Sequence, residues 1–174
     1  MPKVIVHLKE NFLKNAKKII EEKGYDSLSR KELAKESQVA VGTIYNYFPD
    51  KNSLLASIVF EDWSSLENSL LAKIESLSSF EEGVLLFCDS FGSFSSSHQE
   101  LFSHFTNTGT KTYYDSYQSF VEKAGTLLEA LCHRFNKGSE NTDYKLAASL
   151  FSYAIHYPST DQKKLLEAIT SLLD

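Results

Sequence analysis

The stretch SRKELAKESQVAVGTIYNYF, from Ser29 to Phe48, predicts two short helices joined by a tight turn. Ser29 and Glu32 have the spacing of a capping box, in which each side chain bonds a free backbone N–H of the first helical turn. The turn is expected at residues 37–39, with Val39 reaching into the core, and the second helix at Val41 to Tyr47. This part of the chain is therefore expected to form a helix-turn-helix unit.

The second helix of this unit should have one apolar and one polar face. Ile44 and Phe48 are four residues apart and are expected to face the core. Neighbours on a helix point about 100° apart, so the outward face consists of Thr43, Tyr45, Asn46 and Tyr47. A short helix with small polar and tyrosyl side chains on one face is suited to enter the major groove of DNA.

Further helices are expected on both sides of this unit. A first helix runs from Val4 to Lys23 and ends at Gly24, a left-handed C-cap position. Pro49 ends the helix before it, and Asp50 is expected to N-cap a long helix that reaches Ser76. The remaining expected helices are Ser79–Ser95, His98–Phe105, Thr110–Asn136, Thr142–Tyr157 and Thr160–Leu173, with connections at Phe94–Ser97 and Asn136–Asn141.

Length and composition fit a helical protein with two units. The chain has 174 residues, of which 42% are hydrophobic, with only 7 Gly and 3 Pro to form turns. We therefore expect an all-α fold of about nine helices, with a three-helix head at residues 1–52 and a larger helical body at residues 53–174. No apolar run is long enough to cross a bilayer and no signal peptide is evident, so the expected location is cytoplasmic.

The net charge of -5 is unevenly distributed. Residues 1–52 contain ten Lys and Arg against seven Asp and Glu, a net charge of +3, whereas residues 53–174 contain eight against sixteen, a net charge of -8. A basic head on an acidic body can approach phosphates with the head alone.

The segment VAVGTIYNYFPDKNSLL, from Val39 to Leu55, resembles the DNA-binding domain of the tetracycline-repressor (TetR) family of bacterial regulators. It follows the family pattern V-x-x-G-T-[IL]-Y-x-[YH]-F-x-x-K-x-x-L, and the resemblance extends from Asn11 to about Ile58. Gln38 departs from the family, whose turn often has Gly there. Ala40 departs too, since a Ser or Thr cap is frequent at that position.

The resemblance implies roles for individual residues. Val41 and Asn46 occupy positions at which the family reads base edges, and Gly42 allows close approach of the backbone to DNA. The implied contacts to the DNA backbone come from Ser29, Arg30, Lys31, Tyr45, Tyr47 and Lys51, and Thr43 contacts a phosphate or a base. The expected partner is double-stranded DNA with a palindromic operator.

For the body, the resemblance implies a ligand pocket and a homodimer. The last two helices, Thr142–Tyr157 and Thr160–Leu173, are expected to pair with those of a second copy. The aromatic residues between Phe80 and Phe120 favour a pocket for a small apolar or aromatic effector. Its candidate lining residues are Trp63, Phe87, Phe91, Phe102, Tyr113 and Tyr117. The expected function is a transcriptional regulator, most simply a repressor that its effector releases from DNA.

The sequence leaves other functions open. A regulator without a small-molecule effector, constitutive or controlled by a protein, is the nearest alternative, and a helical enzyme or adaptor is more distant. The segment TGTKT, Thr108–Thr112, lacks the spacing of a phosphate-binding loop. Cys88 and Cys132 form no CxxC motif and are expected to be buried thiols. We expect no enzyme activity, no cofactor and no metal site.

Overall fold

The chain is arranged around one long helix, α4, which runs from Lys51 to Ile74. The computed structural model describes residues 7–108, 111–140, 142–156 and 162–173, and within these residues it contains nine α-helices, one short 3-10 helix and no strand. This confirms the predicted all-α fold. The other elements are α1 (Leu8–Lys23), η1 (Tyr25–Ser27), α2 (Arg30–Glu36), α3 (Val41–Tyr47), α5 (Phe80–Ser97), α6 (Gln99–Thr108), α7 (Lys111–Arg134), α8 (Tyr144–His156) and α9 (Gln162–Leu173).

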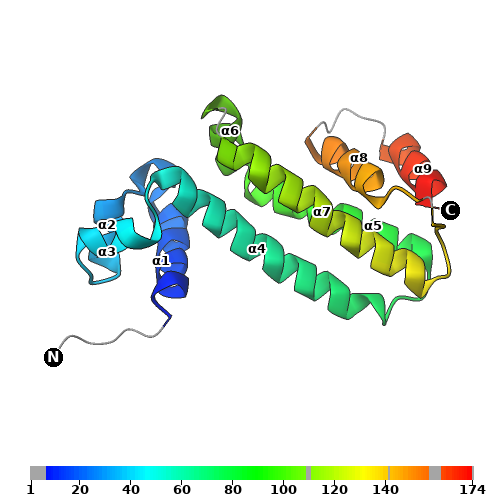
Figure 1. Ribbon diagram of the computed structural model, residues 1–174, viewed down its shortest axis with the longest axis horizontal. Helices are drawn as coiled ribbons and strands as arrows, with labels where there is room; N and C mark the ends of the chain where they lie inside the picture. Colours follow the sequence, from blue (N-terminus) through cyan, green and yellow to red (C-terminus); the bar gives the residue numbers. More distant parts are fainter. Residues whose placement is uncertain (1–6, 109–110, 141, 157–161, 174) are drawn as a thin grey trace.

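Two helical groups share α4 (Figure 1). Helices α1, α2 and α3 gather around its N-terminal end, and we call them, with the first two turns of α4, the head. Helices α5, α7, α8 and α9 lie along or beyond the rest of α4, and we call them, with α6 and the remainder of α4, the body. The exposed end of the head and the C-terminal helices are therefore at opposite ends of the molecule.

Each group has its own hydrophobic core, and α4 contributes to both. Leu54, Leu55 and Ile58 are buried in the head core, whereas Trp63 and Leu70, further along the same helix, are buried in the body core. Val59 packs against both cores. One residue of the body, Leu101 of α6, also belongs to the head core, so α6 reaches across the junction.

The start of α4 is fixed by a complete capping box. The Asp50 carboxylate accepts a hydrogen bond of 2.6 Å from the Ser53 N–H, and the Ser53 hydroxyl accepts one of 3.3 Å from the Asp50 N–H. The expected N-cap is therefore confirmed. At the end of α1, Gly24 has a φ of 79° as expected, but its ψ of 164° lies outside the left-handed helical region.

The serine-rich stretch was wrongly predicted as a connection. Helix α5 continues through Phe94 to Ser97, and α6 begins two residues later at Gln99. The Ser97 hydroxyl donates to the Ser93 carbonyl oxygen at 2.8 Å, which satisfies the side chain within the helix. The bend occurs at His98 instead.

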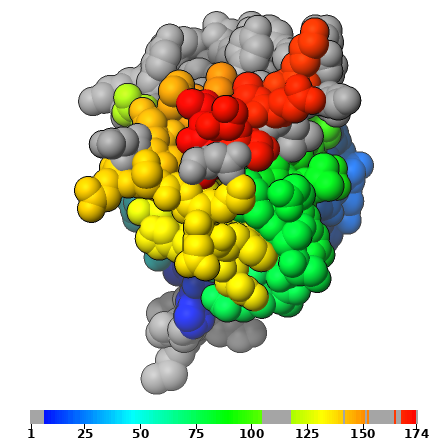
Figure 2. All heavy atoms as spheres, turned by 90° about the vertical axis from the view of Figure 1, so that its right-hand side faces the viewer, coloured from blue at the N-terminus to red at the C-terminus, as the bar shows by residue number. Residues whose placement is uncertain are grey.

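Helix α9 packs beside α8 at the end of the body farthest from the head, and Figure 2 shows it on the face turned toward the viewer. Ile169 and Leu173 of α9 are buried in the body core, together with Cys132 of α7. Other apolar side chains of these last helices point outward, among them Leu146 of α8 and Leu172 of α9. None of the helices in the described ranges is both long and apolar enough to cross a membrane.

Candidate nucleic-acid interface

Helix α2 begins with half of the predicted capping box. The Ser29 hydroxyl accepts a hydrogen bond of 3.1 Å from the Glu32 N–H. The Glu32 carboxylate does not accept the expected hydrogen bond from the Ser29 N–H. It accepts one of 2.6 Å from the Lys23 ammonium instead. The reciprocal bond was therefore wrongly predicted, and Glu32 links α2 to the end of α1 instead.

The turn between α2 and α3 contains an unusual backbone position. Gln38 has a φ of 55°, the left-handed region that favours glycine. Ser37 beside it is buried and accepts a hydrogen bond of 2.9 Å from Asn15 of α1, which holds the turn against the head. Ala40 precedes α3 without a side-chain cap, as the sequence predicts.

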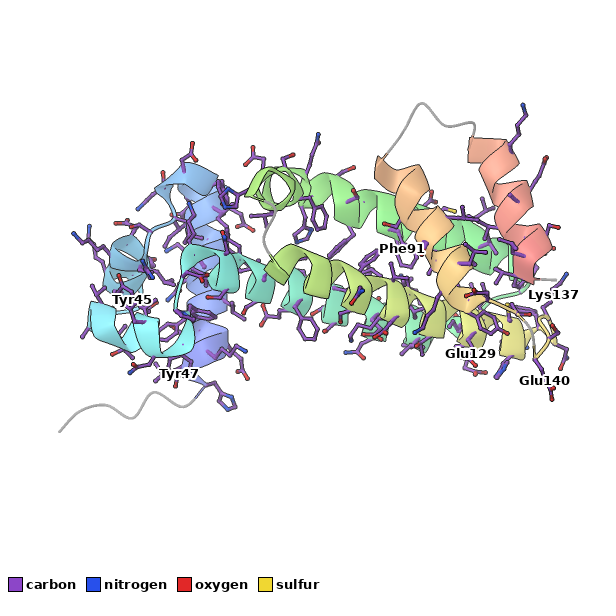
Figure 3. The ribbon with its side chains drawn as sticks, turned by 45° about the horizontal axis from the view of Figure 1, so that its top comes forward. Tyr45, Tyr47, Phe91, Glu129, Lys137 and Glu140 are labelled. Atoms are coloured by element: carbon purple, nitrogen blue, oxygen red, sulfur yellow. The ribbon has the colours of Figure 1, made fainter. Side chains whose placement is uncertain are left out.

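Helix α3 has the two faces expected from its sequence. Ile44 and Phe48 are fully buried in the head core. Tyr45 is 48% exposed and Tyr47 is 42% exposed, and Asn46 between them is exposed too. Figure 3 shows both tyrosines on the outer side of the head, away from the body. Two exposed aromatic side chains on one short helix form a patch of the kind that marks an interaction site.

Gly42 has no structural reason to be glycine. A Cβ atom at this position would meet nothing within 4 Å, and its φ is not in the positive range. Alanine favours a helix over glycine by about 1 kcal/mol, so the fold alone would prefer Ala here. The missing side chain leaves the surface of α3 open to close approach by a partner.

Arg30 supports this surface from α2. Its guanidinium donates to the Pro49 carbonyl oxygen at 2.6 Å and lies 4.0 Å above the centre of the Tyr45 ring. The contact orients the Tyr45 ring and connects α2 to the end of α3. Spacing along the sequence could not reveal it, because Arg30 and Tyr45 lie in different helices.

The Lys51 side chain packs against Tyr25. Its ammonium donates to the Tyr25 carbonyl oxygen at 3.3 Å and lies 4.1 Å from the centre of that ring. Burial lowers the pKa of Lys51 from its ordinary value. The Tyr25 ring also lies 5.3 Å from the His104 ring of α6, and His104 Nε2 is 3.0 Å from the Asn52 side-chain oxygen. The body therefore touches the residues that position Lys51.

The structure brings all ten predicted DNA-contact residues to the head, and none of them is buried. Ser29, Lys31, Gly42, Tyr45, Asn46 and Tyr47 are exposed, and Arg30, Val41, Thr43 and Lys51 are partly exposed. Tyr47 also has an internal role, because its ring packs edge-on against Phe12 of α1 at 5.4 Å.

Four of the six predicted ligand residues lie in the body core or at its edge. The Trp63 ring lies 5.3 Å from Phe91 and 4.2 Å from Phe120. Phe87 is fully buried and Phe102 packs at the edge of this core. The side chains of Tyr113 and Tyr117 lie outside the described residues. The Trp63 indole N–H is buried and has no hydrogen-bond partner in the described structure.

A separate open groove lies between α7 and the start of α8, with a volume of about 470 Å³. Glu122, Glu129 and Asp143 line it, with Lys145 among them. Figure 3 places Glu129 and Glu140, another lining residue, at the end of the body opposite the head. The sequence did not predict this groove. The described residues contain no group of three or more His, Cys, Asp or Glu side chains that could hold a metal ion.

Known proteins resemble both the head and the whole fold. The family described as "Bacterial regulatory proteins, tetR family" matches residues 12–58. The uncharacterized HTH-type transcriptional regulator YuxN of Bacillus subtilis (strain 168) is 43% identical over 47 residues, 27% of this chain and 16% of that protein. HTH-type transcriptional regulator HbdR of Aromatoleum sp. (strain CIB) is 29% identical over 76 residues, 44% of this chain and 33% of that protein. The aligned segments thus span a third or less of these relatives.

The similarity in fold extends further than the similarity in sequence. The crystal structure of Thermus thermophilus FadR, a TetR-family transcriptional repressor in complex with lauroyl-CoA, aligns with 94% of this chain and 92% of its own, with a TM-score of 0.68. Its sequence is 15% identical, so the likeness concerns the fold.

Proposed function

We propose that this chain, a member of the tetR family of bacterial regulatory proteins, is a transcriptional regulator that binds DNA through the outward face of α3. The observation that carries the proposal is the pairing of exposed Tyr45 and Tyr47 with Gly42, whose missing side chain the fold does not require. A regulator of this kind acts in the cytoplasm, where bacterial DNA lies.

Each contact residue has a proposed task. Val41 and Asn46 read base edges in the major groove, where Val can touch a thymine methyl group and Asn can pair with adenine. Tyr45 donates to a phosphate while Arg30 holds its ring. The remaining contacts to the DNA backbone are assigned to Ser29, Lys31, Thr43, Tyr47 and Lys51, which surround the same face.

The proposed active form is a homodimer on a palindromic operator. One short helix covers few base pairs, and two heads related by a two-fold axis cover two half-sites. The exposed Leu146 of α8 and Leu172 of α9 support pairing through the last two helices. Residues 1–52 are then assigned to DNA binding, and residues 53–174 to effector binding and dimerisation.

We also propose that a small apolar or aromatic effector binds near the Trp63 cluster and releases the DNA. A buried N–H without a partner costs about 1–3 kcal/mol, and an effector with a hydrogen-bond acceptor would satisfy the Trp63 indole. Six residues are the proposed lining: Trp63, Phe87, Phe91, Phe102, Tyr113 and Tyr117. A panel of aromatic compounds and acyl-CoAs, titrated into the DNA complex, tests this. Release by none of them would favour a regulator without a small-molecule effector.

Selection of bound duplexes from random DNA tests DNA binding itself. The proposal predicts a palindromic product that binds two protomers. The K31A variant should reduce the steepness of log K against log salt concentration by about 1.8, since each of the two protomers loses one phosphate contact worth about 0.9. K137A removes the same charge at the far end of the body (Figure 3) and should leave the slope unchanged. Absence of any selected duplex at low salt would overturn the proposal.

A further inference from the structure

A row of charged side chains joins the head to the body along α4. The Lys17 ammonium of α1 donates to Glu61 at 2.5 Å and to Asp62 at 2.6 Å. The second carboxylate oxygen of Asp62 lies 3.0 Å from Nε2 of His98, the residue at the bend between α5 and α6. Lys17 belongs to the head and His98 to the body, so these contacts cross the junction between the two.

Both ring nitrogens of His98 face hydrogen-bond acceptors. Nε2 faces the Asp62 carboxylate, and Nδ1 lies 2.8 Å from the Phe94 carbonyl oxygen. A neutral imidazole has only one N–H, whereas the imidazolium has two. Only the doubly protonated ring can therefore donate to Asp62 and Phe94 at the same time.

The surroundings of His98 favour its positive charge. His98 is the C-cap of α5, where the helix dipole is negative. The Phe94 ring of α5 lies 4.3 Å from its ring, and the Phe102 ring of α6 lies 6.1 Å away. The charged groups around it come from α1 and α4: with His98 protonated, the two cations Lys17 and His98 balance the carboxylates of Glu61 and Asp62.

Asp62 keeps its negative charge across the neutral range. Burial by itself would raise the pKa of Asp62, but the hydrogen bonds from His98 and Lys17 outweigh it and hold that pKa below its ordinary value. The same contacts with Asp62 and Glu61 outweigh the effect of burial on Lys17 and raise its pKa. Lys17 and Asp62 therefore stay charged, and the number of protons on the His98 imidazole decides whether both of its acceptors are satisfied.

We propose that Lys17, Asp62 and His98 form a proton-dependent latch that fixes the orientation of the head on the body. The latch is complete while His98 is doubly protonated. It loosens when the ring becomes neutral, because the ring then loses its charge attraction to Asp62 and one of its two acceptors faces a lone pair. His98 acts here as a positioning residue. The consequence for DNA rests on the proposed function: two heads of fixed orientation are preorganised for two half-sites, and this advantage declines as the pH rises.

The first test needs no DNA. In ¹⁵N-labelled protein at pH 6.0, the latch predicts protected protons on both Nδ1 and Nε2 of His98, and loss of the Nε2 protection in the D62A variant. An Nε2 proton that exchanges equally fast in both proteins would overturn the latch. If the Nε2 proton is protected in a protein that binds no duplex, the proposed function is refuted and the latch is still supported.

The second test compares a duplex that has both half-sites with one that has a single half-site. Between pH 6.0 and 8.0, at constant ionic strength, the wild-type preference for the two-site duplex should fall about fivefold, within the usual range of coupling between sites. The preference of H98Q and D62N should change little with pH. H133Q removes an exposed histidine at the end of α7 and should respond like the wild type. The latch would be overturned if the wild-type preference did not change with pH. It would also be overturned if the preference of H98Q fell with pH as much as that of the wild type.

Discussion

In the head the two tyrosines of α3 lie at the surface, whereas in the body Trp63 of α4 and the Phe91 and Phe94 rings of α5 are packed against one another. Phe91 is fully buried between Trp63 and Phe87, while Tyr45 is about half exposed and its ring lies beneath the Arg30 guanidinium. The same class of side chain therefore stabilises the fold in one region and is available to a partner in the other. Substitutions in the two regions should separate stability from binding.

The largest effect is expected for F91A. Removing a fully buried phenylalanine ring costs about 3–5 kcal/mol of unfolding free energy, because burial is lost and a cavity remains. Denaturant unfolding measures this change. The matched variant F60A removes a ring of α4 that is 54% exposed, and it should cost less than about 1 kcal/mol. Equal losses in the two variants would contradict the division between packed and available rings.

The next effect concerns the thiol of Cys88 in α5. Burial, and to a smaller extent Asp89, raises the pKa of Cys88 to about 11. Only the thiolate reacts, so at pH 8 labelling should be about 200-fold slower than for a free cysteine of pKa 8.5. The rate should increase about tenfold per pH unit up to pH 10. Rapid labelling at pH 8 would show that this face of the body opens, and unfolded protein provides the fast reference.

A smaller effect on binding is expected for Y45F. The variant keeps the ring beneath Arg30 and removes only the hydroxyl, so the unfolding free energy should stay within about 0.5 kcal/mol of the wild type. Loss of a hydrogen bond to a charged phosphate should weaken DNA binding about tenfold. Y144F deletes a hydroxyl in the body and serves as the control in the same binding assay. Unchanged affinity in Y45F would remove Tyr45 from the proposed interface.

The smallest effect is expected at the turn of the head. Gln38 has a positive φ, so Q38G should relieve backbone strain and raise the unfolding free energy by about 0.5–1 kcal/mol. Q38A keeps the Cβ atom and should give no gain. Thermal unfolding of the two variants measures the change in unfolding free energy. A larger increase for Q38A than for Q38G would contradict backbone strain at Gln38.

Short-range features of the fold could be predicted from the sequence. Helix α3 has the predicted bounds, and Asp50 caps α4, because helical period and caps depend on residues within four positions. Glu32 was misassigned, since a lysine from another helix competed for its carboxylate. The serine stretch was misassigned because serine hydroxyls can bond within a helix.

The outward face of α3 could be predicted, because it depends on helical period within one short segment. The contacts from other helices that hold this face in place could not be predicted. Arg30 bonds to a carbonyl 19 residues away, and His98 meets a carboxylate 36 residues away. No period or cap in one sequence links residues at such separations across different helices. The head–body contacts therefore become visible only when the helices are placed in space.

If the surface of α3 is shaped for DNA rather than for the fold, the G42A variant should stabilise the protein and weaken its binding. A Cβ atom at Gly42 meets only open space, so the unfolding free energy should rise by about 0.5–1 kcal/mol. Affinity for the selected duplex should fall at least about tenfold, because the added methyl group keeps the helix from the groove. Wild-type affinity in a stabilised G42A protein would contradict a surface shaped for DNA.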